Sequence, residues 1–248
     1  MHALIPDALL TELNALQQRI LREGLPVLVV FEGSSGRVIG RVNSELIRCL
    51  EPRGVLYVHF DPAADASRPI LDFLHKTPGR GQIGLFDRSW YSMIIEKFNE
   101  DEKKKEFKSM LDVSNDLERY LVLNGVFLIK IILKATESAI EKYGKEYGPR
   151  IPKKSFLSMD HIDPAKYREV MFDQVYEKTD TEYAPWNKIL VKGINETVIE
   201  TVEKIIGMVN SRLDAGPRPY DPPKIDRIYP NPRKNMERKR SVPTMTKR

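Results

Sequence analysis

The chain has 248 residues, of which 41% are hydrophobic and 30% charged, as in an ordinary soluble globular protein. A single cysteine excludes an internal disulfide framework, four scattered histidines give no zinc cluster, and no apolar run is long enough to span a bilayer. The N-terminus lacks the basic region and long apolar core of a signal peptide, so we expect a cytoplasmic protein that has no membrane partner.

The net charge of +5 is concentrated at the C-terminal end. Residues 225–248 carry eight Lys or Arg and two Asp or Glu, so this segment has a charge of +6 and the rest of the chain about −1. Seven of the 17 prolines lie between Pro217 and Pro243, which predicts an extended or unstructured basic tail over 217–248. Such a tail is either simply solvated or binds a polyanion by counterion release. It gives little reason to expect nucleic-acid binding by the folded body.

Apolar strands alternate with helices along residues 1–216, which we expect to form one α/β domain. The patterns predict helices at 7–23, 40–50, 67–75, 102–123 and 195–213, and strands at 25–32, 55–60, 82–86, 126–133 and 189–191. This alternation is typical of a parallel sheet covered on both faces. Residues 135–180 are polar and helical in pattern, and they predict a helical lid. Lys130 interrupts an apolar strand, so it must reach water or a buried partner.

A glycine-bearing turn, Gly33–Gly40, follows the first strand. Glycine and serine at a strand-to-helix junction are typical of loops whose backbone N–H groups cradle phosphate. Such a loop normally supplies a lysine to the terminal phosphates, and here Ile39 stands in that place. An ordinary turn also favours glycine and serine, so both interpretations remain open. The candidate phosphate- or nucleotide-binding residues are Gly33, Ser34, Ser35, Gly36, Arg37 and Gly40.

A second candidate, Gly84–Tyr91, closes the third strand. Asp87 stands at the carboxyl end of that strand, on the edge where open parallel sheets bind ligands. A carboxylate at this position can hold magnesium, and the planar guanidinium of Arg88 can bind phosphate. An aspartate that caps the next helix is the alternative, although it would not explain the residues around it.

Two further segments carry weaker signals. Lys178–Trp186 combines a Thr-Asp-Thr turn with a tryptophan, which alone predicts a loop anchored by an aromatic side chain. The segment 142–166 is rich in cations, including Arg150, Lys153 and Lys154. These cations would suit either a lid that closes on a polyanion or a solvated helix face.

Together these segments resemble the type-2 polyphosphate kinase family over roughly Leu9–Leu213. The matching segments are Phe31–Gly33, Glu51–Val55, Leu85–Tyr91, Leu157–Asp160, Met171-Phe172, Thr179–Thr181 and Ala184–Trp186. The resemblance implies a P-loop-kinase-like parallel sheet flanked by helices, with a helical lid. It further implies magnesium-dependent phosphate transfer between polyphosphate and nucleotides.

Residue roles also follow from the resemblance. It assigns catalysis to Asp87 and Arg88, with Asp87 also holding the metal. Phosphate binding falls to the Gly33–Gly40 turn, and polyphosphate binding in the lid to Arg150, Lys153 and Lys154.

The chain departs from the family pattern at its phosphate loop. The family form is Gly-x-Asp-Ala-Ala-Gly-Lys-Gly, and an ungapped match from Gly33 puts Ser35 at the aspartate and Ile39 at the lysine. Met93 replaces a further arginine, while a one-residue gap would bring Arg37 toward the lysine position.

These losses lead us to expect an impaired or non-catalytic copy. It would retain the fold and bind nucleotide, polyphosphate or another subunit, as a homo-oligomer or with an active paralogue. The alternative is an active magnesium-dependent phosphotransferase with a rearranged site.

Overall fold

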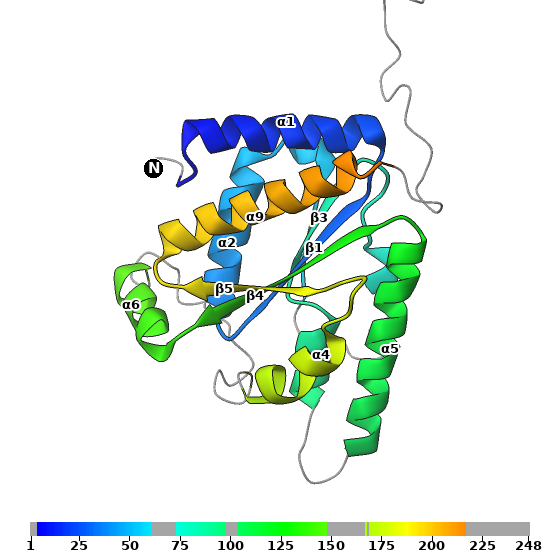
Figure 1. The fold of residues 1–248 in the computed structure, drawn as a ribbon. Coiled ribbons are helices and arrows are strands. Elements are labelled where there is room, and N and C mark those ends of the chain that lie inside the picture. The colour runs from blue at the N-terminus through cyan, green and yellow to red at the C-terminus, as the bar shows by residue number, and fades with distance from the viewer. Residues whose placement is uncertain (1–3, 61–72, 98–103, 148–166, 168, 217–248) are drawn as a thin grey trace, which may run out of the picture.

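A five-stranded parallel sheet forms the centre of the computed structural model, which describes residues 4–60, 73–97, 104–147, 167 and 169–216 (Figure 1). The strands are β1 (Val27–Gly33), β2 (Val55–His59), β3 (Ile83–Asp87), β4 (Phe127–Ala135) and β5 (Trp186–Val191). Their order across the sheet is β2-β3-β1-β4-β5, and every neighbouring pair is parallel. The fold is therefore the predicted α/β architecture, and β1 lies in the middle of the sheet.

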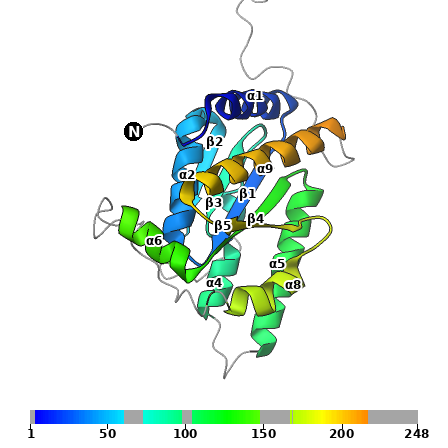
Figure 2. The same cartoon turned by 60° about the vertical axis from the view of Figure 1, so that its left-hand side comes forward.

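Helices cover both faces of this sheet (Figures 1 and 2). One face carries α1 (Asp7–Glu23), α2 (Gly36–Cys49) and α9 (Ile194–Asp214). The opposite face carries α4 (Trp90–Lys97), α5 (Lys104–Leu123), a π-helical turn η4 (Met171–Val175) and α8 (Tyr176–Thr179). A short 3-10 turn η1 (Pro52–Gly54) precedes β2, and α6 (Glu137–Tyr147) follows β4.

Strand side chains alternate between two apolar cores. In β1, Val29 and Phe31 pack with α1, α2 and α9, while Leu28 and Val30 pack on the opposite face. This period-2 alternation is the consequence of the strand pleat. Because both faces of β1 are covered, all seven of its residues are buried. The C-terminal end of β1 therefore reaches the carboxyl end of the sheet with packed side chains on both faces.

Several predicted boundaries are corrected by the structure. Helix α2 begins at Gly36, four residues before the predicted start at Gly40, because the turn after β1 is short. The helix α4 was not predicted, and β5 begins at Trp186 rather than Ile189. The helix predicted at 67–75 lies mostly outside the described residues, as does the tail at 217–248.

The predicted lid is described only in part. Its first section is α6, and its last section contains η4 and α8, whereas residues 148–166 lie outside the described residues. The division into a domain over 1–216, a lid and a tail therefore stays a prediction. Among the described helices, none is both long and apolar enough to cross a bilayer.

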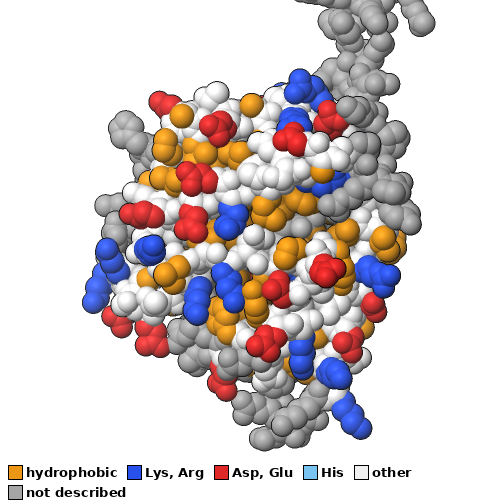
Figure 3. All heavy atoms as spheres, in the orientation of Figure 1, with side chains coloured by type: hydrophobic (Ala, Val, Ile, Leu, Met, Phe, Trp, Pro, Cys, Tyr) orange, Lys and Arg blue, Asp and Glu red, His pale blue; other side chains and the backbone are white. Residues whose placement is uncertain are grey.

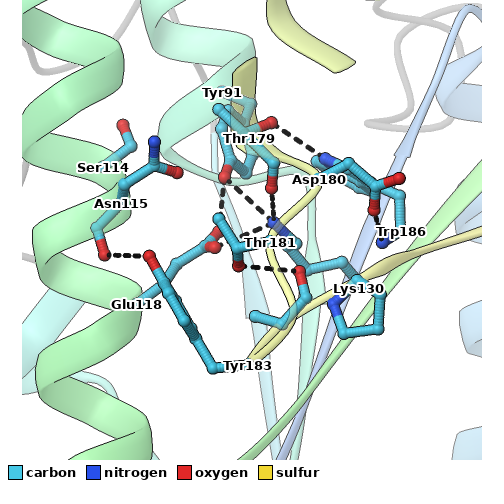
Figure 4. Close-up of polar contacts among 12 residues, drawn as sticks. Tyr91, Ser114, Asn115, Glu118, Lys130, Thr179, Asp180, Thr181, Tyr183 and Trp186 are labelled. Carbon is cyan, nitrogen blue, oxygen red and sulfur yellow. Dashed lines mark hydrogen bonds and ion pairs between the residues drawn. The ribbon is translucent and has the colours of Figure 1, made fainter. Parts of the chain in front are cut away.

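Lys130 has the buried partners that the sequence required (Figure 4). Its ammonium donates to Glu118 Oε2 at 2.8 Å and to the Thr179 carbonyl at 2.5 Å, and it lies 4.8 Å from the centre of the Trp186 ring. Tyr91 donates to the other Glu118 oxygen. Burial raises the pKa of Glu118 and lowers that of Lys130, whereas their mutual attraction opposes both shifts. The network ties β4 to α4, α5 and the start of β5.

Candidate functional site

The carboxyl end of β3 presents Asp87 to the edge of the sheet. Its Oδ2 accepts a hydrogen bond from the Tyr57 hydroxyl at 3.0 Å and lies 3.5 Å from His59 Nδ1. Its Oδ1 is buried and has no hydrogen-bond partner among the residues that the structure describes. A buried carboxylate oxygen without a partner is costly, unless a ligand outside the protein satisfies it. Asp87 therefore has one acceptor that a ligand could use.

Arg88 connects this strand end to β1. Its backbone has a left-handed φ of 69°, which is uncommon for a residue other than glycine. Its guanidinium donates to the Gly33 carbonyl and to Ser92 Oγ, both at 3.3 Å, and lies 5.6 Å from the centre of the Tyr167 ring. The structure thereby brings two predicted site residues, Arg88 and Gly33, into direct contact.

The buried carboxylate of Glu32 lies beside Arg88 and binds the residues that follow it. It accepts hydrogen bonds from Ser89 Oγ at 2.6 Å, from Ser92 Oγ at 2.6 Å and from the Tyr167 hydroxyl at 2.7 Å. Burial raises the pKa of Glu32, while the positive charge of Arg88 opposes that shift. Through these bonds Glu32 joins β1, the start of α4 and Tyr167, which lies within the predicted lid.

The turn between β1 and α2 consists of Ser34 and Ser35 alone. Both hydroxyls are buried and find no hydrogen-bond partner in the described part of the chain. Ser35 holds the N-cap position of α2, but its side chain makes no capping hydrogen bond there. Gly33 is required here by space, since a Cβ would lie 2.7 Å from the Leu133 carbonyl oxygen. Two orphaned hydroxyls at a helix N-terminus suit a phosphate oxygen as acceptor.

The remaining residues of the predicted phosphate loop lie elsewhere. The ungapped match to the family motif puts Ile39 at the position of the lysine that binds phosphate. In the structure its side chain is instead fully buried in the apolar core beneath α1 and α9. Gly40 lies within α2, where its carbonyl accepts the Ser44 hydroxyl at 2.7 Å.

The nearby arginines also point to other neighbours. Arg37 lies against α6, with Nη1 3.8 Å from the position of a Cβ on Gly144. Arg41 pairs with buried Glu45 at 2.8 Å. Because α2 starts early, Val38 to Arg41 are ordinary helix positions and not parts of a loop.

One metal ion fits the donors at this edge. Asp87 offers a single free oxygen, a hard ligand of the kind that Mg²⁺ prefers. Among the described residues, no group of three or more His, Cys, Asp or Glu could hold a metal by itself. Magnesium commonly takes one or two carboxylates and completes its shell with water and substrate phosphates, so one aspartate is compatible with it.

Three residues around Asp87 and Arg88 were not predicted as site residues from the sequence, namely Glu32, Tyr57 and Tyr167. Glu32 was included only within the matching segment Phe31–Gly33. An acidic residue at the end of an apolar strand could by itself have indicated a functional carboxylate. Tyr57 and Tyr167 carried no signal, because their roles depend on strand order and packing. Arg150, Lys153 and Lys154 lie outside the described residues.

A family model described as Polyphosphate kinase 2 (PPK2) matches residues 6–214, which is most of the chain. The chain belongs to the polyphosphate kinase 2 family. The crystal structure of Polyphosphate Kinase 2 from Arthrobacter aurescens TC1 superposes with a TM-score of 0.70 at 20% identity, covering 94% of this chain and 85% of that one. This likeness establishes the P-loop-kinase-like fold.

Curated relatives of the family differ in the nucleotide that they name. The chain is 25% identical over 186 residues to ADP-polyphosphate phosphotransferase 3 of Rhizobium meliloti, covering 71% of this chain and 64% of that one. It is 27% identical over 198 residues to Polyphosphate:AMP phosphotransferase of Pseudomonas syringae pv. tomato, covering 76% and 39%. It is also 23% identical to GDP-polyphosphate phosphotransferase of Mycolicibacterium smegmatis, covering 79% and 72%. The chain thus spans less than two thirds of the first two relatives.

Proposed function

We propose that this chain binds polyphosphate and a nucleotide at the edge formed by Asp87, Arg88 and the β1–α2 turn, and that it transfers phosphate far more slowly than its relatives. The observation that carries the proposal is the contrast between the β3–α4 turn, which holds Asp87 and Arg88, and the β1–α2 turn. Asp87 keeps a buried oxygen free for a ligand, whereas the β1–α2 turn supplies two hydroxyls and no ammonium group.

Phosphoryl transfer depends mainly on positioning and on neutralising the charge of the transferred group. In this chain Arg88 supplies a guanidinium beside the end of β1, and Ser34 and Ser35 supply hydroxyls. Magnesium at Asp87 would neutralise charge on the phosphate oxygens when bound. No side chain of the described turn replaces the lysine, because Ile39 is in the core and Arg37 lies against α6.

The expected catalytic loss is large. Removing one preorganised charge costs on the order of 100- to 1000-fold in rate. The lysine, the loop aspartate and the arginine at Met93 are all absent, although such losses do not simply add. Binding suffers less, because the phosphate-facing hydroxyls, Arg88 and Asp87 remain.

A second function, an active phosphotransferase with a rearranged site, is favoured by the intact Asp87–Arg88 pair. In that case the magnesium-dependent chemistry would rely on Asp87 and on cations outside the described residues. The two functions differ in rate rather than in site, so one experiment separates them.

Purified full-length protein is assayed with polyphosphate, Mg²⁺ and AMP, ADP or GDP, beside the Rhizobium meliloti relative as a positive control. Calorimetry in parallel measures binding of polyphosphate and nucleotide. We expect binding of both ligands and turnover at least about 1000-fold below that of the relative. Turnover within tenfold of the relative, lost in Asp87→Asn, would establish the active alternative. Failure to bind either ligand would refute both.

A further inference from the structure

A cavity lies beside the first turn of α2, on the opposite side of β1 from Asp87. It has a volume of about 290 Å³ and is lined by the first turn of α2, by α6 and by the connection between β5 and α9. These three parts meet at the left of Figure 1. Since β3 and β4 flank β1 on opposite sides, Asp87 and this cavity flank the same strand end. The function proposed above makes no use of the cavity.

The inner wall of the cavity is apolar. Val38, Val191 and Ile194 are buried there, and the ring of Tyr143 is almost fully buried beside them. Its volume lies at the low end of the roughly 300–1,000 Å³ found for small-molecule sites. Such a wall gains free energy by covering a flat apolar group.

The rim of the cavity is polar and exposed. Lys142 and Lys192 stand there with Asn195 and Glu196, and neither lysine forms an ion pair with another described residue. Lys and Arg side chains lie on the left of the face in Figure 3, over α6 and β5, with acidic side chains among them. Gly193 leaves room for the carboxylate, because a Cβ there would lie 2.3 Å from Glu196 Oε2.

This combination distinguishes a nucleotide from a bare phosphate chain. A phosphate chain would be repelled by Glu196 and would gain nothing from the apolar wall. A nucleotide offers a base to the wall, polar base edges to the amide of Asn195, sugar hydroxyls to Glu196 and phosphates to the two lysines. Each lining group then has a complementary partner.

We propose that this cavity binds the base and sugar of a nucleotide whose phosphates extend toward Ser34 and Ser35. Val38 connects the two regions, since it lines the cavity three residues after the N-cap of α2. The proposal rests on the proposed function only for the placement of the phosphates. The nucleoside part depends on the cavity alone.

The test compares two probes with the same number of phosphates, inorganic tripolyphosphate and a ribonucleoside triphosphate. Calorimetry with each of the common bases should show at least one nucleotide binding about tenfold tighter than tripolyphosphate. Ala139 of α6 also lines the cavity, so a phenylalanine there would fill it. In Asn195→Ala and in Ala139→Phe this ratio should fall close to one, with tripolyphosphate affinity unchanged within twofold. Lys145→Ala, on the same helix as Lys142 but outside the cavity, should match the wild type.

Glu196→Gln sharpens the test, because the two ligands respond in opposite directions. Loss of the rim charge should weaken nucleotide binding and strengthen tripolyphosphate binding, each by about threefold. A wild-type ratio near one for every base, or a ratio that survives Asn195→Ala and Ala139→Phe in folded protein, overturns the proposal. Binding of a nucleoside without phosphates, lost in Ala139→Phe, would support the cavity even if tripolyphosphate fails to bind and the proposed function is wrong.

Discussion

The β1–α2 turn and the β3–α4 turn leave the same edge of the same sheet, yet they present different polar groups there. The β3–α4 turn keeps Asp87 with a free oxygen and Arg88 in a left-handed conformation. The β1–α2 turn is reduced to two serines, and the positions of its expected loop belong to a helix whose Ile39 is core. The comparison teaches that two neighbouring strand ends of one sheet can present different polar groups, depending on where the following helix begins.

The largest expected effect comes from placing a lysine at Ile39, the position in α2 that the family motif gives to lysine. Ile39→Lys should lower the free energy of unfolding by about 3–5 kcal/mol, because it buries a charge without a partner. Urea unfolding measures this loss. Ile39→Leu, a swap of equal volume, should cost less than about 1.5 kcal/mol. A stable Ile39→Lys protein that gains phosphate transfer would show that the turn still works as a phosphate loop.

The next largest effect concerns Asp87 in the β3–α4 turn. Asp87→Asn should reduce any remaining magnesium-dependent transfer by about 100- to 1000-fold and should abolish the strengthening of tripolyphosphate binding by Mg²⁺. Tyr57→Phe is the matched control, because it removes the partner of Oδ2 and leaves Oδ1 free. We expect a change below about tenfold there. Equal Mg²⁺ dependence in wild type and Asp87→Asn would remove Asp87 from the metal site.

A smaller effect depends on pH and concerns Glu32, which lies between the two turns. Because its pKa is raised, the folded state holds its proton more tightly than the unfolded state does. Its contribution to stability is therefore complete below the unfolded pKa of 4.5 and is lost as the pH rises through the folded pKa.

Denaturation of wild type and Glu32→Gln over a pH series reveals this contribution. The wild type should lose stability relative to the variant as the pH rises, by about 1.4 kcal/mol for each unit of pKa shift. A difference that stays constant with pH would mean that the pKa of Glu32 is unchanged on folding.

The smallest effect concerns the two orphaned hydroxyls. Ser34→Ala and Ser35→Ala should each change stability by less than about 1 kcal/mol, because neither hydroxyl makes a hydrogen bond that would be lost. Each should weaken tripolyphosphate binding by about two- to tenfold. Ser44→Ala serves as the control, since its hydroxyl already bonds within α2. Unchanged affinity in both turn variants would place the phosphates elsewhere.

The sequence by itself determined the fold and the position of Asp87 at a strand end. The apolar runs predicted as strands at 25–32, 82–86 and 126–133 correspond to β1, β3 and β4, and Asp87 at a strand end is on the ligand edge of a parallel sheet. The charge of Lys130 inside an apolar run required a buried partner, which Glu118 provides. These conclusions follow from local periodicity and from the cost of burying charge.

Only the tertiary structure decided what became of the phosphate loop. The sequence showed Ile39 in place of a lysine but not that α2 starts at Gly36 and turns that side chain into the core. The orphaned oxygens of Ser34, Ser35 and Asp87, the hydroxyl of Tyr167 on Glu32 and the cavity beside α6 depend on segments distant in sequence. Strand order and helix packing bring those segments together, and periodicity along the chain carries no information about either.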